Sequence, residues 1–110
     1  MSLFKHPEAV IAFSTVDSEK EAQKIAKALV QSKLAACVNI IPETTSIYEW
    51  KGEICEEKEL LLVIKTTPAR LDKLKATLEE LHPYEVPELV VCPIVDGLPD
   101  YLSWVFEHTK

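Results

Sequence analysis

The strongest constraint on the fold is a long hairpin pattern centred on Lys51-Gly52. Glycine suits the positive φ angles of a tight turn between antiparallel strands. The strand before the turn is predicted to start at Leu34 and is interrupted at Pro42, which cannot donate to a strand ladder and so marks an edge or a bulge. The return strand is predicted over residues 53–66, with a charged first half and an apolar second half. A hairpin of this length projects beyond the core of a small domain.

A strand and a helix are predicted before the hairpin. Residues 10–13 form a short apolar run rich in β-formers, which predicts a buried strand. Ser18, with Glu21 three residues later, is a capping-box pattern and predicts the start of a helix. The apolar side chains that recur at helical spacing after it are Ala22, Ile25, Ala26 and Leu29.

Three more elements are predicted after the hairpin. Thr67-Pro68 opens a second helix, with a hydroxyl at the cap and proline at the first helical position, and Pro83 ends it. Residues 89–95 form the last apolar strand, and Asp96-Gly97 then turns the chain into a short terminal helix.

The resulting order, β-α-β-β-α-β followed by a C-terminal helix, predicts an α+β fold of the split-βαβ, ferredoxin-like kind. We expect residues 1–110 to form a single domain, with four strands in one antiparallel sheet and two helices on one of its faces.

The predicted strands lack the alternation of a sheet that has one face in water. Continuous apolar runs occupy residues 10–13, 60–64 and 89–95, and 47% of the 110 residues are hydrophobic. We therefore expect both faces to be covered. Because the two main helices cover only one face, the terminal helix is expected to hide part of the other, and a subunit contact the rest.

Charge and cysteine content narrow the class of protein. Twelve basic against eighteen acidic residues give a net charge of −6, which argues against nucleic acid as a partner. Residues 1–8 do not read as a signal peptide, and no apolar run is long enough for a membrane span. An odd count of widely spaced cysteines argues against a disulfide framework. We expect a cytoplasmic protein with reduced thiols.

Motifs of common enzyme classes are missing from the sequence. The only glycines are Gly52 and Gly97, each in a predicted turn, so phosphate-cradling and dinucleotide fingerprints are excluded. HExxH, CxxC and GxSxG are likewise absent. A Cys37 hydrolase would need a neighbouring base and an orienting third group, which the sequence does not supply. We therefore expect a binding protein rather than an enzyme.

Functional side chains concentrate in residues 82–88, a polar and aromatic segment pinned by two prolines. His82 is interpreted either as a metal ligand or as the residue that ends the second helix. Cys37 is interpreted either as a thiolate ligand or as a small buried apolar side chain.

Two further groups on the hairpin have a functional and a structural interpretation. Glu57 and Glu59 face one side of their strand and Glu56 the other, and a solvated hairpin is the favoured explanation for these carboxylates. Tyr48 and Trp50 lie two residues apart and share one face, where they are suited to stack on a ligand or to anchor an interface.

Four collinear blocks between residues 10 and 105 give the chain its resemblance to the CutA divalent-cation-tolerance family. They are Lys33 to Asn39, Ser46 to Gly52 with Glu59 and Ile64-Lys65-Thr66, Leu81 to Glu88, and Asp100 to Trp104. The resemblance implies a ferredoxin-like subunit in a tight homotrimer, similar to PII signalling proteins, with hairpins that reach across to neighbouring sheets. It also implies a role in tolerance of divalent metals, copper in particular.

The resemblance also bears on the metal ligands. In metal-binding members, a cysteine at the end of the first strand and two adjacent histidines before Pro-Tyr hold copper. Here those positions are Ser14, Leu81 and His82, so only the last is kept. The site predicted here consists of His82 with Cys37, Glu85 or Glu88, shared across a subunit boundary.

These observations lead to two hypotheses. The first is a non-enzymatic homotrimer for divalent-cation tolerance that binds Cu(II) or another divalent cation and no organic cofactor. The second is a PII-like trimeric signalling or scaffold protein that binds a small molecule or a protein at subunit clefts.

Overall fold

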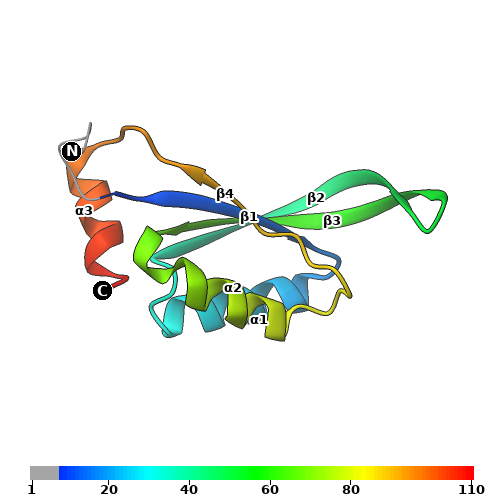
Figure 1. Cartoon of the computed structure of the whole chain (residues 1–110), viewed down its shortest axis with the longest axis horizontal. Coiled ribbons are helices and arrows are strands. Elements are labelled where there is room, and N and C mark those ends of the chain that lie inside the picture. The colour runs from blue at the N-terminus through cyan, green and yellow to red at the C-terminus, as the bar shows by residue number, and fades with distance from the viewer. Residues whose placement is uncertain (1–7) are drawn as a thin grey trace.

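The computed structural model, which describes residues 8–110, contains one four-stranded antiparallel sheet with the strand order β2-β3-β1-β4 (Figure 1). The strands are β1 (Val10–Val16), β2 (Cys37–Trp50), β3 (Glu53–Thr66) and β4 (Val90–Pro93). The helices are α1 (Glu19–Gln31), α2 (Leu71–Leu81), which follows a 3-10 turn η1 (Pro68–Arg70), and α3 (Pro99–Glu107). The predicted element order is confirmed. The expectation about a signal peptide concerns residues 1–8, of which only Glu8 lies within the described residues.

The two main helices start in different ways. The predicted cap of α1 is confirmed, because the Glu21 N–H donates to Ser18 Oγ at 3.1 Å. The predicted hydroxyl cap at Thr67 is wrong. Thr67 precedes the 3-10 turn but makes no side-chain cap bond, and its Oγ1 lies instead 3.3 Å from Oγ1 of Thr109, where the C-terminal segment packs. Arg70 Nε donates to the Thr109 carbonyl at the same junction.

The hairpin has the turn and the bulge that the sequence predicts. Lys51 and Gly52 both have positive φ, 51° and 83°, as a two-residue turn between twisted strands requires. The β2–β3 register shifts between Ile41 and Thr44, where Glu43 has a φ of 61°.

The ends of two strands were predicted less well. The strand predicted from Leu34 starts at Cys37, because Leu34 to Ala36 form a buried connection after Lys33, whose φ is 61°. The strand predicted over residues 89–95 is limited to β4.

The core lies between the sheet and the helices α1 and α2, which pack on one face (Figure 1). All four predicted stripe residues of α1 are buried there, together with alternate residues of β1 and β3. The central members of this cluster are Ala12, Val16, Ile25, Leu29, Leu62, Ile64, Leu74 and Leu78. Burial of these side chains is the main apolar contribution to stability.

The other face of the sheet is less well covered. Ile11 and Phe13 of β1 and Leu61 and Val63 of β3 alternate with the core residues and are only half-buried. Helix α3 lies at the end of the sheet opposite the hairpin tip (Figure 1), where Leu102 and Val105 pack with Ala9 and Ala36. The subunit contact expected over the rest of this face stays a prediction.

The outer part of the hairpin extends away from the helices (Figure 1) and makes the molecule 47 Å long but only 27 Å and 23 Å across. Its apolar side chains are exposed, with Ile47 at 66% and Ile54 at 74% of their full accessibility. Among residues 8–110, no helix has the length and apolar character needed to cross a membrane.

Candidate functional site

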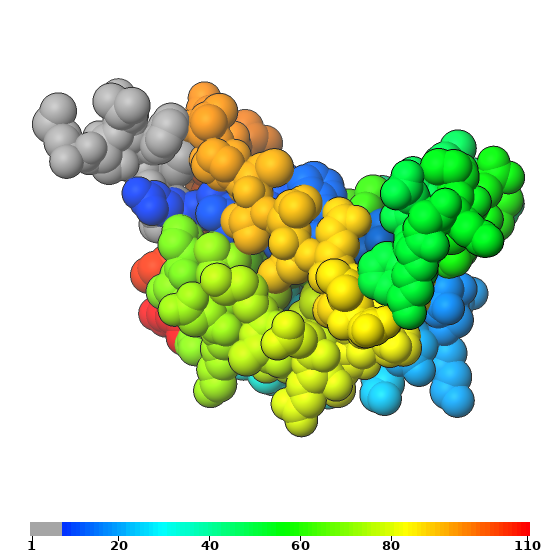
Figure 2. All heavy atoms as spheres, turned by 45° about the vertical axis from the view of Figure 1, so that its right-hand side comes forward, coloured from blue at the N-terminus to red at the C-terminus, as the bar shows by residue number. Residues whose placement is uncertain are grey.

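A pocket lies where the hairpin leaves the core. Figure 2 shows the chain around residues 83–88 running beside the hairpin. The pocket has a volume of about 770 Å³. Its lining residues come from the end of β1, both hairpin strands and the segment after α2, and they are Thr15, Asp17, Ser46, Ile47, Tyr48, Trp50, Cys55, Glu57, Glu59, Tyr84, Glu85, Val86 and Glu88. Within the described part of the chain this lining includes five carboxylates and no basic side chain, and we call it the acidic pocket.

Strand pairing explains why these side chains meet. Val16, the last residue of β1, pairs with Leu60, so β3 continues towards the hairpin tip beyond the end of β1. Directly paired residues point to the same face of a sheet. The pairs Ser46 with Glu57 and Tyr48 with Cys55 therefore place a polar and aromatic set on one face of the outer hairpin.

Glu59 is the buried carboxylate of the acidic pocket. Only 5% of its surface is exposed, and the hydroxyl of Tyr84 donates to its Oε2 at 2.6 Å. Burial and the contact with Glu59 raise the pKa of Tyr84, so this phenol stays a donor at neutral pH. The other oxygen of Glu59, Oε1, makes no hydrogen bond within residues 8–110. The solvated-hairpin interpretation is therefore wrong for Glu59.

Tyr48 and Glu57 form a similar but exposed pair further along the hairpin. The Tyr48 hydroxyl donates to Glu57 Oε1 at 2.7 Å. This hydrogen bond, with smaller contributions from burial and from the charge of Glu57, raises the pKa of Tyr48 to about 12. Both tyrosines thus hold a carboxylate of the pocket through a protonated hydroxyl.

His82 lies between the acidic pocket and the core. Its prediction as the residue that ends the second helix is confirmed, because it is the C-cap of α2 and its N–H donates to the Leu78 carbonyl at 2.8 Å. The side chain is 6% exposed. The Tyr84 N–H donates to His82 Nδ1 at 3.2 Å, which makes Nδ1 the unprotonated nitrogen and Nε2–H the donor to the Thr15 carbonyl at 2.8 Å. Both ring nitrogens are thus in use, and the metal-ligand interpretation stays a prediction.

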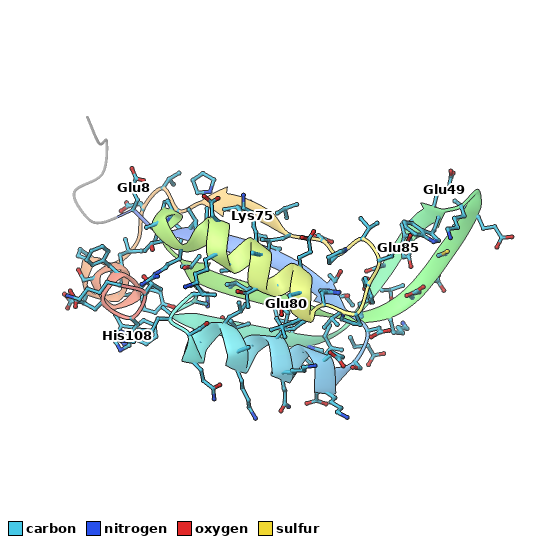
Figure 3. All side chains as sticks on the ribbon, turned by 60° about the horizontal axis from the view of Figure 1, so that its bottom comes forward. Glu8, Glu49, Lys75, Glu80, Glu85 and His108 are labelled. Atoms are coloured by element: carbon cyan, nitrogen blue, oxygen red, sulfur yellow. The ribbon has the colours of Figure 1, made fainter. Side chains whose placement is uncertain are left out.

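The remaining predicted ligands lie at opposite ends of the sheet. Glu85 and Glu88 are exposed and line the acidic pocket, and Figure 3 shows Glu85 near the base of the hairpin. Cys37 pairs with Lys65, whose Nζ lies 4.0 Å from Sγ. Lys65 and Glu59 are six positions apart on β3, which separates Cys37 from the pocket by roughly 20 Å. The protomer thus brings Glu85 and Glu88 together but not Cys37.

The described residues do not form a convergent metal site within one protomer. No group of three or more His, Cys, Asp or Glu side chains in residues 8–110 is arranged to hold a metal ion. Ser14 stands at the position where the family resemblance implies a cysteine ligand, and it is fully buried. Its hydroxyl has no hydrogen-bond partner within residues 8–110. Five carboxylates are the most numerous donors in the acidic pocket, beside the free thiol of Cys55, and carboxylate oxygens suit hard divalent cations.

Sequence reasoning missed the role of three pocket residues: Asp17, Glu59 and Tyr84. Period-two alternation did place Glu57 and Glu59 on one face of their strand. The partner that buries Glu59 is 25 residues away, and no local signal pairs a tyrosine with a particular carboxylate at that separation. Asp17 carries no signal beyond its place at the end of a strand.

Comparison with known proteins gives concordant matches. Residues 10–108 match the family described as CutA1 divalent ion tolerance protein. The divalent-cation tolerance protein CutA of Thermus thermophilus is 54% identical over 99 residues, which cover 90% of this chain and 96% of that protein. Protein CutA of Mus musculus is 48% identical over 99 residues, and the chain spans about half of its length, 56%.

Solved structures agree with these sequence matches. The divalent cation tolerance protein CutA1 of Thermus thermophilus has a TM-score of 0.90 at 52% identity and covers 93% of this chain and 99% of its own. CutA1 of Oryza sativa has a TM-score of 0.92 at 35% identity and covers 96% of both chains.

Proposed function

Because the chain belongs to the CutA1 divalent ion tolerance family, we propose that it acts in the tolerance of divalent cations as a non-enzymatic homotrimer that binds Cu(II) or another divalent cation. The observation that carries the proposal is the acidic pocket, whose five carboxylates have no basic side chain among the described lining residues. Such a set of like charges attracts cations and raises their local concentration.

Glu85 and Glu88 are the ligands that one protomer offers most directly, because both are exposed and line the acidic pocket. His82 joins such a site only by releasing the Thr15 carbonyl or the Tyr84 N–H. Cys37 joins only from another subunit, since it lies far from the pocket of its own protomer. Oxygen donors favour a hard cation over copper, for which imidazole nitrogen is a better ligand.

Exposed apolar surface supports the homotrimer. The sheet face opposite α1 and α2 is half-buried, and the outer hairpin exposes Ile47, Trp50 and Ile54. Association of three ferredoxin-like subunits in a PII-like arrangement, with each hairpin on a neighbouring sheet, would cover both surfaces. We expect light scattering to give the mass of three chains at micromolar concentration, and a stable monomer would contradict the proposal.

Calorimetric titration with Cu(II), Zn(II), Mn(II) and Mg(II) tests the metal site. We expect Glu85→Gln and Glu88→Gln each to weaken binding of the preferred cation about tenfold or more, because a charged ligand is lost. Glu80→Gln is the matched control, since Glu80 is exposed on α2 and does not line the pocket (Figure 3). Unchanged binding in both pocket variants would remove these carboxylates from the site. Equal binding heats in the wild type and His82→Ala would remove His82 as a ligand.

The PII-like alternative is favoured by a different observation. A volume of about 770 Å³ with aromatic and aliphatic walls is more than one metal ion needs and is typical of a pocket for a small molecule. No metal binding at micromolar concentration, together with a higher unfolding temperature in the presence of a small molecule, would favour this alternative.

A further inference from the structure

The walls of the acidic pocket differ from those of a metal site. Tyr48, Trp50 and Tyr84 supply aromatic surface, and Ile47 and Val86 supply aliphatic surface. Aromatic faces and aliphatic walls bind the apolar part of a ligand, and aromatic faces also attract cations. A bare metal ion uses neither kind of surface, whereas an organic cation uses both.

The carboxylates of the acidic pocket are also spaced for a ligand larger than an ion. No three acidic, cysteine or histidine side chains within residues 8–110 converge on one point. A divalent metal ion needs several oxygen ligands at about 2.0–2.6 Å from the same centre. An extended cation with two separated charges instead matches carboxylates that are distributed between the floor and the rim of a pocket.

Glu59 supplies the specific recognition element. Its side chain is more than nine-tenths buried and lines the acidic pocket, Tyr84 occupies Oε2, and Oε1 has no partner in the described chain. Ser14 Oγ is the one buried side-chain oxygen or nitrogen without a partner in residues 8–110, so Oε1 of Glu59 is accessible from the pocket and open to a donor from a ligand. A positively charged N–H group complements this carboxylate oxygen, and a primary ammonium supplies such a group whereas a quaternary ammonium does not.

From these observations we propose that the acidic pocket binds an alkyl diammonium compound. One primary ammonium donates to Glu59 Oε1, the methylene chain contacts Tyr48 and Val86, and the second ammonium lies near the rim carboxylates Glu85 and Glu88. The inference rests on the small-molecule alternative of the proposed function and does not require metal binding.

Tyr84 and His82 act in this site as positioning residues. The Thr15 carbonyl fixes the His82 ring, the ring accepts the Tyr84 N–H, and the Tyr84 hydroxyl holds Glu59. The chain of contacts runs from β1 to the floor of the pocket, so it orients the Glu59 carboxylate without either residue touching the ammonium.

Calorimetric titration of the full chain with diaminobutane and with spermidine tests the proposal, with tetramethylammonium as the probe that lacks N–H donors. We expect saturable binding of both amines that weakens as salt is added, and at least tenfold weaker binding of tetramethylammonium. Glu59→Gln should weaken amine binding about tenfold or more, since it removes the charge but keeps an oxygen for Tyr84. Glu56→Gln is the matched control, because Glu56 is exposed on the opposite face of the same strand and does not line the pocket.

The outcomes separate this inference from the metal proposal. Glu57→Gln, on the exposed part of the lining, gives a second test if Glu59→Gln unfolds, and we expect it to weaken amine binding more than Glu56→Gln does. The inference is overturned by an absence of saturable amine binding, by equal affinity for tetramethylammonium, or by equal affinities in the pocket and control variants. Metal binding without amine binding would overturn this inference alone, and amine binding without metal binding would overturn the metal proposal alone.

Discussion

The two halves of the hairpin share one ladder and one turn but have opposite environments. The inner half, residues 37–41 with 60–66, lies beside β1 and beneath α1 and α2, and Leu62 and Ile64 are fully buried there. The outer half, residues 44–59, pairs only with itself, and Ile47 and Ile54 are mostly exposed. Apolar side chains on the same strands thus stabilise the fold in one half and remain free for contacts with a partner in the other.

Glu59 marks the boundary between the halves. It follows the β2 bulge in the register, pairs with Thr44 and lies just beyond the end of β1. Its burial depends on Tyr84 and the segment after α2, whereas burial in the inner half depends on the helices. The acidic pocket forms at this boundary, where a packed scaffold holds a projecting element.

The largest difference between the halves should appear in truncation of a buried and an exposed side chain. We expect Leu62→Ala to lower the free energy of unfolding by about 2–5 kcal/mol, because it leaves a cavity in the core. Ile54→Ala should change the free energy of unfolding of the isolated protomer by less than about 0.5 kcal/mol, because the side chain is exposed. Urea denaturation at several protein concentrations measures both, and a concentration-dependent loss in Ile54→Ala would identify a subunit contact. If Leu62→Ala and Ile54→Ala lowered the free energy of unfolding equally at high dilution, the division of the hairpin into two halves would be contradicted.

Much of this division was accessible from the sequence. Pro42, Lys51 and Gly52 predicted the bulge and the turn, because proline and positive-φ positions have local causes. The stripe of α1 was predicted completely, since helical periodicity alone identifies it.

The predictions failed where tertiary contacts decide the outcome. Leu34 to Ala36 resemble a strand but form a buried connection, and the Thr67 hydroxyl contacts Thr109 in place of a helix N–H. The candidate site was predicted only in part for the same reason. Glu85 and Glu88 were recognised from a dense local segment, but the burial of Glu59 depends on a tyrosine from another element.

The contact at the boundary should have an intermediate effect. We expect Tyr84→Phe to lower the free energy of unfolding by about 1–3 kcal/mol, because Glu59 then loses the one side-chain hydrogen bond that it makes within residues 8–110 while it stays buried. Tyr48→Phe is the matched control on the exposed outer half, where its hydrogen bond to Glu57 is open to solvent. Denaturant titration at neutral pH compares the two variants. A loss in Tyr48→Phe as large as that in Tyr84→Phe would show that burial at the boundary is not the cause.

Alkaline pH tests the same two tyrosines without mutation. Their pKa values are raised above the ordinary value of 10.0, to about 12 for Tyr48 and further for Tyr84. A raised pKa in the folded state means that the stabilisation is complete below pH 10 and is lost as the pH rises towards the folded-state value. The free energy of unfolding should therefore decrease from about pH 10 upwards, and Tyr84→Phe should flatten this dependence. An unchanged slope in Tyr84→Phe would contradict its contact with Glu59.

The smallest effect should come from the hairpin tip. Gly52 has a φ of 83°, and a Cβ added there would meet no atom within 4 Å, so Gly52→Ala acts on backbone conformation alone. We expect Gly52→Ala to lower the free energy of unfolding by about 1 kcal/mol. Amide hydrogen exchange should become faster in residues 44–59 and stay unchanged in residues 60–66. Lys51→Asn is the reciprocal variant, because asparagine tolerates the positive φ of 51° better than lysine does, and it should slow exchange in the same outer residues. Faster exchange of the inner residues in Gly52→Ala would mean that the halves open as one cooperative unit, and the acidic pocket would then lie within a single folded element.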